Sequence, residues 1–89
     1  MTHFDRLPAV ERRLGGGRSL VHLVDGAMPV ELAGSAPVVW DLLDIFSNVD
    51  DVAAALNQRY IDEPDVIAEG MWTALKLLRE AGLILERSS

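Results

Sequence analysis

Two histidines are the residues of this sequence best suited to act as a general acid or base. His3 lies close to the N-terminus and His22 lies in an apolar stretch, and neither has a local pattern of partner residues around it. A catalytic base must be held next to the proton that it removes. The chain also has no cysteine, which excludes thiolate catalysis, disulfides and zinc ribbons. We therefore predict no catalytic residue.

Four aspartates in the middle of the chain are the candidate metal ligands. Asp50 and Asp51 are also explained as first-turn residues of a helix, where carboxylates favour the helix dipole. Asp41 and Asp44 fit the solvent face of an earlier helix. The segment 50–62 lacks the alternating oxygen ligands of a calcium-binding loop. The sequence therefore predicts no metal site.

A run of three glycines before Arg18, at 15–17, is the candidate phosphate-binding loop. The run is not followed by a lysine and a hydroxyl residue, and no helix is expected to begin there. A flexible connection between two strands explains it better. We expect no cofactor, and the sequence indicates a protein that is not an enzyme.

Length and composition predict one small folded domain. The chain has 89 residues, and 49% of them are hydrophobic, which excludes the disordered class. It has no apolar run long enough to span a membrane and no signal peptide, so we expect a cytoplasmic protein without membrane contact. The formal net charge is −6, and residues 41–69 hold eight acidic side chains and one basic one. This field repels phosphate backbones, so we expect no nucleic-acid partner.

Three strands are predicted in the first third of the chain, at 9–14, 19–24 and 27–32. The Asp25-Gly26 pair between the last two is a hairpin signal. A register in which facing residue numbers add up to 51 sorts the side chains best. It gives one wholly apolar face, made of Val21, Leu23, Met28, Val30 and Leu32.

Pro29 indicates that the third strand lies at the edge of the sheet. Proline has no N–H to donate to a neighbouring strand. A four-residue loop closed by Leu23 and Met28 turns position 29 outward and keeps the facing pairs. A free edge of this kind is either a liability or a docking site.

Three helices follow from about residue 35. Ser35 and Asn48 are the predicted N-caps of the first two, and the third runs from Pro64 to about Ala81, with Gly82 just after it. Residues 83–85 follow as a short strand or a packed tail. The order predicts an α+β, winged-helix-like domain, in which a three-stranded antiparallel sheet is followed by three helices. We place this domain at 9–85, with a flexible N-terminal tail at 1–8 and a C-terminal tail at 86–89.

The third helix has two distinct aspects. A stripe at helical spacing must face the core, and it contains Ile67, Met71, Ala74, Leu75 and Leu78. A second stripe beside it holds Ala68, Trp72, Lys76 and Arg79. A tryptophan flanked by two long cations has the composition of a binding rim. Alternatively, Trp72 covers the edge of the core under the Lys76 stem, and the pattern leaves both interpretations open.

Several segments together resemble PqqD-like proteins. The most specific is the ending Leu-x-x-Leu-x-x-x-Gly-Leu at 75–83, and the others lie at 39–44, 49–56, 60 and 65–66. These proteins are RiPP recognition elements, which bind the leader peptides of ribosomally synthesised, post-translationally modified peptides. One departure is Ala33 after Leu32, where many members have Leu-Asn. The length and Trp40 look most like the small proteins of lasso-peptide biosynthesis.

The resemblance implies a peptide-binding protein without catalysis. In such domains the leader peptide adds as an antiparallel strand to the third strand, in a cleft beside the third helix. The protein would present this precursor leader to a leader peptidase or a modifying enzyme. The cleft is then expected to be lined by Met28, Pro29, Val30, Glu31 and Leu32 of the strand and by Ala68, Met71, Trp72, Leu75, Lys76 and Arg79 of the helix.

Two other functions stay open at this point. One is a winged-helix DNA-binding regulator whose recognition helix is 65–81, although that segment has three acidic residues against two basic ones. The other is a structural subunit that dimerises through its edge strand. We expect a monomer or a weak dimer.

Overall fold

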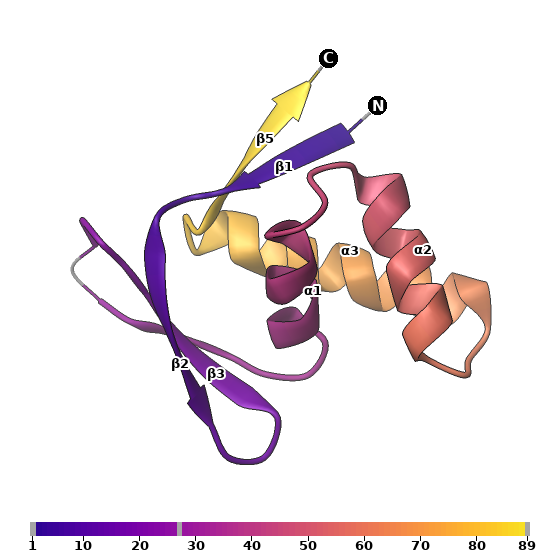
Figure 1. The fold of residues 1–89 in the computed structure, drawn as a ribbon, viewed down its shortest axis with the longest axis horizontal. Coiled ribbons are helices and arrows are strands. Elements are labelled where there is room, and N and C mark those ends of the chain that lie inside the picture. Colours follow the sequence, from indigo (N-terminus) through magenta and orange to yellow (C-terminus); the bar gives the residue numbers. More distant parts are fainter. Residues whose placement is uncertain (1, 27, 89) are drawn as a thin grey trace.

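The computed structural model describes residues 2–26 and 28–88 and contains two small antiparallel sheets and three helices (Figure 1). The predicted α+β class, with a three-stranded sheet followed by three helices, is confirmed. In chain order the elements are β1 (Thr2–Arg6), β2 (Ala9–Leu14), β3 (Arg18–Leu23), β4 (Val30–Leu32), α1 (Ala36–Leu43), α2 (Val49–Arg59), α3 (Pro64–Glu80) and β5 (Ile84–Ser88).

The three-stranded sheet has the order β2-β3-β4, and the predicted register of its second hairpin is confirmed. Ser19 pairs with Leu32 and Val21 pairs with Val30, so the facing numbers add up to 51. Val21 and Leu32 are fully buried, and their burial fixes the register, because a slip of one residue would turn both to solvent.

Strand β4 is shorter than predicted and lies at an edge of its sheet. It begins only after Pro29, which cannot donate to β3. The Gly26 N–H bonds to the Leu23 carbonyl, so the chain turns before positions 23 and 28 can pair. Met28 is 76% exposed, and its predicted place on the apolar face was wrong. Position 27 of the predicted strand lies outside the described residues.

The helix ends follow the predicted caps, with one difference. The Asn48 side chain accepts a hydrogen bond from the Asp50 N–H at 2.8 Å, as an N-cap does. Ser35 stands at the N-cap of α1, but its side chain makes no capping bond. Helix α3 ends at a left-handed Gly82, and the Leu83 N–H bonds to the Leu78 carbonyl at 3.0 Å. This is the Schellman arrangement that glycine at C′ favours.

The core forms where the apolar stripe of α3 meets α1 and α2. All five residues of the predicted stripe are buried, from Ile67 to Leu78. Trp40 of α1 is fully buried, and the guanidinium of Arg6 lies 3.9 Å from the centroid of its ring. Among the described residues, no helix is long and apolar enough to cross a bilayer.

The expected tails at 1–8 and 86–89 are strands over most of their length. Strand β1 pairs with β5 in antiparallel register, from Thr2 with Ser88 to Arg6 with Ile84. Phe4 is only 2% exposed and joins the core. One phenylalanine in a polar segment gives no periodic signal, and its partner strand lies at the far end of the chain, so the sequence pattern did not indicate this sheet.

We expect Phe4→Ala to lower the free energy of unfolding by about 3 to 5 kcal/mol, because it leaves a cavity in the core. Val10→Ala is the matched control, since Val10 lies in a strand but is 66% exposed. Urea denaturation followed by circular dichroism measures both. Equal stability of the two variants would contradict the anchoring of β1 by Phe4.

Candidate functional site

Helix α3 lies between the two sheets and presents a different flank to each. In Figure 1, β1 and β5 reach above this helix and β4 passes below it, with α1 in front. Strand β5 packs against α3, whereas the connection after β4 reaches the helix through Ser35. A helix repeats every 3.6 residues, so the side chains that face the two sheets belong to different rows.

The flank toward β4 is marked by Gly70. The hydroxyl of Ser35, three residues after Leu32 at the end of β4, donates a hydrogen bond to the Gly70 carbonyl at 3.3 Å. Thr73 and Leu77 follow on the same side, at i+3 and i+7. Leu77 is 42% exposed, so this row of the helix presents a large apolar side chain to solvent.

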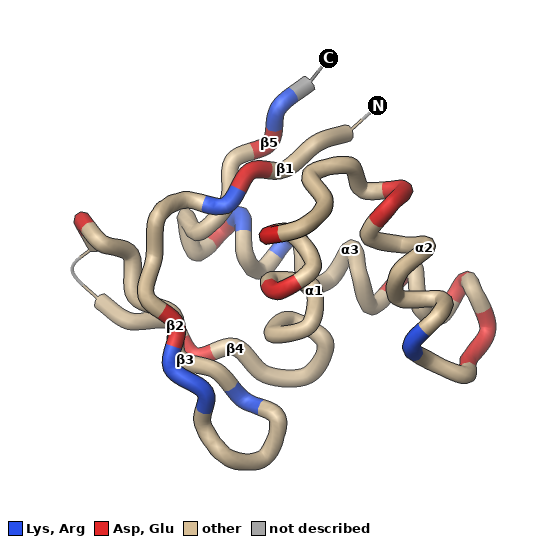
Figure 2. Tube along the Cα trace, in the orientation of Figure 1, with Lys and Arg blue, Asp and Glu red and all other residues tan. Residues whose placement is uncertain are grey.

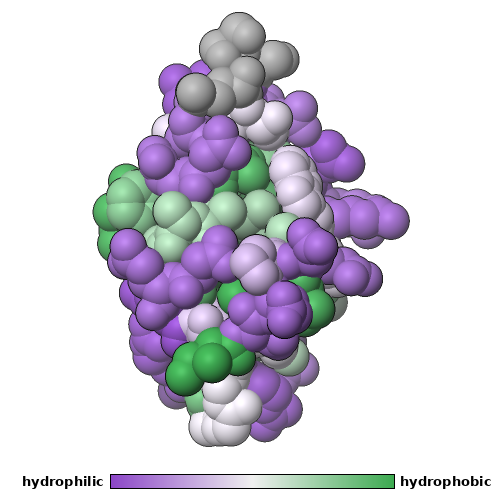
Figure 3. All heavy atoms as spheres, turned by 90° about the vertical axis from the view of Figure 1, so that its right-hand side faces the viewer, coloured by the Kyte–Doolittle hydropathy of each residue, from purple (hydrophilic) through white to green (hydrophobic). Residues whose placement is uncertain are grey.

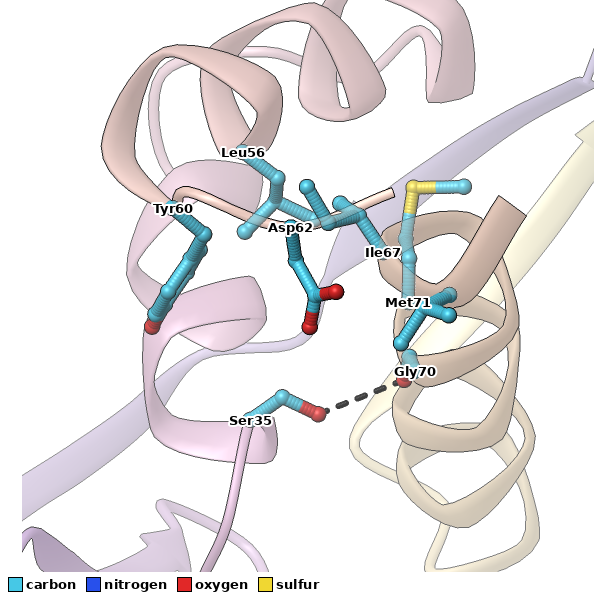
Figure 4. Close-up of a pocket in the computed structure, with 8 residues that line it drawn as sticks. Ser35, Leu56, Tyr60, Asp62, Ile67, Gly70 and Met71 are labelled. Carbon is cyan, nitrogen blue, oxygen red and sulfur yellow. Dashed lines mark hydrogen bonds between the residues drawn. The ribbon is translucent and has the colours of Figure 1, made fainter. Parts of the chain in front are cut away.

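An apolar hollow of about 160 Å³ opens at the end of this flank (Figure 4). We call it the Gly70 pocket. In Figure 4, Leu56 of α2 and Ile67 and Met71 of α3 lie on one side of it and Ser35 lies on the other, with the Asp62 carboxylate between them. Its lining consists of Ser35, Leu56, Tyr60, Asp62, Val66, Ile67, Gly70 and Met71.

The flank toward β1 carries the aromatic and basic stripe. Trp72, Lys76 and Arg79 line a second hollow together with Leu75 and with Phe4 of β1. Trp72 is 47% exposed, and Arg79 forms an ion pair with Glu86 of β5 at 3.1 Å. No residue of β4 lines this hollow, and the cleft predicted between this stripe and the third strand stays a prediction.

Two of the remaining predicted helix residues belong to the core. Met71 and Leu75 are buried in the core, although Met71 also borders the Gly70 pocket. Ala68 lies one turn before Trp72 and shares its row on the helix.

Of the five residues predicted on the strand side of the cleft, two precede β4 and three belong to it. Met28 and Pro29 are exposed and precede the strand. Val30 is half-buried and Leu32 is fully buried, so both point to the core. Glu31 points outward and forms an ion pair with Arg18 of β3 at 2.9 Å. The outer edge of β4 pairs with no strand within 2–26 and 28–88.

Charge is divided between the two ends of the molecule. Figure 2 shows basic residues on the β2–β3 hairpin and acidic residues along α2 and the connection to α3. On the hairpin, Arg13 pairs with Asp41 at 3.0 Å. The end of the molecule formed by α2 and the connection to α3 therefore carries most of the net negative charge.

The candidate catalytic and metal-binding residues do not converge. His22 Nε2 lies 2.9 Å from the Gly26 carbonyl, and His3 forms a strand bridge with Asn48 at the other sheet. Over the described part of the chain, no three histidine or acidic side chains gather as a metal site would require.

Comparison with known families gives a match over most of the chain. The family model described as coenzyme PQQ synthesis protein D (PqqD) matches residues 17–84. The chain belongs to the PqqD family. Its members are accessory, peptide-binding partners in the biosynthesis of ribosomally made, modified peptides, and the resemblance to RiPP recognition elements is confirmed. No curated protein and no solved structure matches the chain significantly.

The PqqD match includes the β3–β4 hairpin and all three helices, but it leaves out β1 and β2. The family region therefore contains the β4 edge and both flanks of α3. The β1–β5 sheet, which forms one wall of the Trp72 flank, is built largely from residues outside the match.

Sequence reasoning missed Gly70, Thr73 and Leu77. Helical periodicity identifies which residues face the core, but it does not tell on which side of the helix a strand packs. Two signals were present. Leu77 is a large apolar residue outside the core stripe, and Gly70 is a glycine inside a helix, where glycine is unfavourable.

We expect Gly70→Ala to stabilise this PqqD-family protein by about 0.5 to 1 kcal/mol, because it removes a glycine from a helix interior. A Cβ atom at this position would meet only Ser35 Oγ, at 3.9 Å. Gly82→Ala is the matched control and should destabilise the fold, since Gly82 has φ of 75°. Chemical denaturation measures both. A loss of stability in Gly70→Ala would contradict the open space beside it.

Proposed function

We propose that this protein is a non-catalytic adaptor that binds the leader of a precursor peptide and presents it to a leader peptidase or a modifying enzyme. The leader adds as an antiparallel strand to the outer edge of β4. The observation that carries the proposal is this edge, which pairs with no strand in the described part of the chain and leads into Ser35, whose hydroxyl bonds to α3, in a chain of the PqqD family. A lasso-peptide pathway stays a prediction from sequence resemblance.

The edge of β4 suits the addition of a strand. Peptide N–H and C=O groups give affinity, and alternate side chains give specificity. The buried Leu32 and the ion pair between Glu31 and Arg18 hold β4 against β3, so the edge is fixed before a peptide arrives. Pro29 offers a carbonyl but no N–H, which centres the hydrogen bonding on the residues that follow it.

The β4 flank of α3 forms the second wall of the proposed site. Gly70 and Thr73 are small, and Leu77 exposes apolar surface that a leader side chain would cover. Burying such surface stabilises a complex by about 25 cal/mol for each Å² removed from water.

The hollow at the Trp72 flank is lined by residues of α3 and by Phe4 of β1 and by none of β4, so this flank stays accessible when a peptide occupies the β4 edge. An adaptor needs a second free surface of this kind to hold an enzyme near the bound leader. Such linkage raises the effective concentration of the substrate at the enzyme without any new chemistry.

We test the proposal by amide NMR titration of the labelled protein with the leader of a precursor peptide encoded beside its gene. Saturable shifts at Val30, Glu31 and Leu32 and along the β4 flank are expected, with none from a duplex DNA control. If the DNA caused chemical-shift changes that become smaller at high salt, and the leader peptides caused none, a winged-helix regulator would be favoured instead.

Two matched variants decide which flank of α3 binds the leader. Leu77 and Trp72 are 42% and 47% exposed on the same helix, so the same replacement perturbs the fold similarly at both. We expect Leu77→Asp to weaken leader binding at least tenfold and Trp72→Asp to change it less than threefold, as measured by calorimetry on folded variants. The reverse order would assign the leader to the Trp72 flank.

A further inference from the structure

The Gly70 pocket lies where the β4 edge ends. From Leu32 the chain passes through Ala33 and Gly34 to Ser35, whose hydroxyl reaches the Gly70 carbonyl at the pocket mouth. A peptide strand on β4 that continues past Leu32 therefore arrives at this opening. The pocket measures about 160 Å³, and a cavity of roughly 150 Å³ with aliphatic walls is enough to hold benzene.

Nothing in the fold requires a glycine at position 70. Its φ is not positive, and a Cβ atom would have no neighbour closer than 3.9 Å. Glycine here costs about 0.8 to 1 kcal/mol relative to alanine. Any larger side chain would project toward Ser35 and narrow the mouth of the pocket. The glycine is accounted for if the opening must stay free for a ligand.

Strand direction fixes which part of the peptide reaches the pocket. Strand β4 runs from Val30 toward the Ser35 end. An antiparallel partner runs the other way, so its N-terminal part lies at the Ser35 end. Ser35, which lines the pocket, follows Leu32 by three residues, so the peptide residues just N-terminal to the one that faces Leu32 are those directed toward the pocket.

The surroundings of the pocket are acidic. Asp62 lines the pocket, and one of its oxygens accepts the Glu63 N–H at 2.8 Å. Asp65 and Glu69 follow on α3, against the single base Arg59 at the end of α2. Tyr60, Ile61 and Val66 near the pocket are exposed. Figure 3 shows hydrophobic patches among hydrophilic residues on this face of the molecule. An apolar pocket surrounded by carboxylates suits a peptide in which an apolar residue stands next to a basic one.

We propose that the Gly70 pocket holds a bulky apolar side chain of the leader, N-terminal to the stretch that pairs with β4, with a lysine or arginine next to it in the peptide. This anchor rests on the proposed strand addition. The anchor sets the register of the leader on β4. Main-chain hydrogen bonds alone would not fix this register, because they form equally well when the peptide shifts along the strand. The core peptide then leaves at the Met28 end of β4.

A small probe tests the pocket without any leader. N-acetyl-phenylalaninamide should shift the methyl resonances of Leu56, Ile67 and Met71 saturably at millimolar concentration, whereas N-acetyl-alaninamide should not. Gly70→Leu should abolish these shifts, and Gly15→Leu, a matched change in an open loop, should leave them unchanged. Equal shifts from both probes, or shifts that persist in Gly70→Leu, would overturn the pocket as a site for bulky apolar groups.

Leader variants test the anchor itself. We expect replacement of one bulky apolar leader residue by alanine to weaken binding at least tenfold and to remove the shifts at Ile67 and Met71 while those at Val30–Leu32 persist. Gly70→Ala, which should be more stable than the wild type, should still bind more weakly. Shifts along β4 without any at the pocket would overturn the anchor and leave the adaptor standing. Absence of shifts along β4 would overturn the adaptor, and with it the anchor.

Discussion

The burial of one apolar stripe on α3 is the constraint on which the rest of the structure depends. The stripe from Ile67 to Leu78 must face α1 and α2, which fixes the rotation of the helix about its axis. Once this rotation is set, the row with Trp72 faces the β1–β5 sheet, and the row with Gly70 faces the end of β4. One hydrophobic requirement therefore creates two separate surfaces on a helix of 17 residues.

Much of the fold was predictable because its signals are local. Burial of Val21 and Leu32 specifies the hairpin register, Asn48 bonds within its own turn, and Gly82 ends α3 where left-handed backbone is needed. These features need no knowledge of distant parts of the chain. The shorter β4 follows from a local cause as well, since Pro29 cannot donate a hydrogen bond.

The features that escaped prediction depend on contacts between distant segments. Strand β1 becomes ordered because β5, at the other end of the chain, pairs with it and because Phe4 enters a core built by other elements. The strand side of the candidate site was predicted and its helix side was not, for a related reason. The edge strand follows from Pro29 and the hairpin, but the flank of α3 beside it depends on how the sheet packs across the helix, and a helical repeat contains no such information. Ser35 illustrates the same point, because its hydroxyl makes no capping bond in α1 and donates instead to the Gly70 carbonyl of α3.

The pairing of Thr2 with Ser88 has a consequence for the architecture of larger proteins. Strands β1 and β5 lie side by side, so residues 2 and 88 are neighbours at one end of this sheet (Figure 1). A domain whose ends lie together can be placed within a surface loop of another protein with little distortion of either partner. The pairing of β1 with β5 therefore gives this fold the geometry that an inserted domain requires.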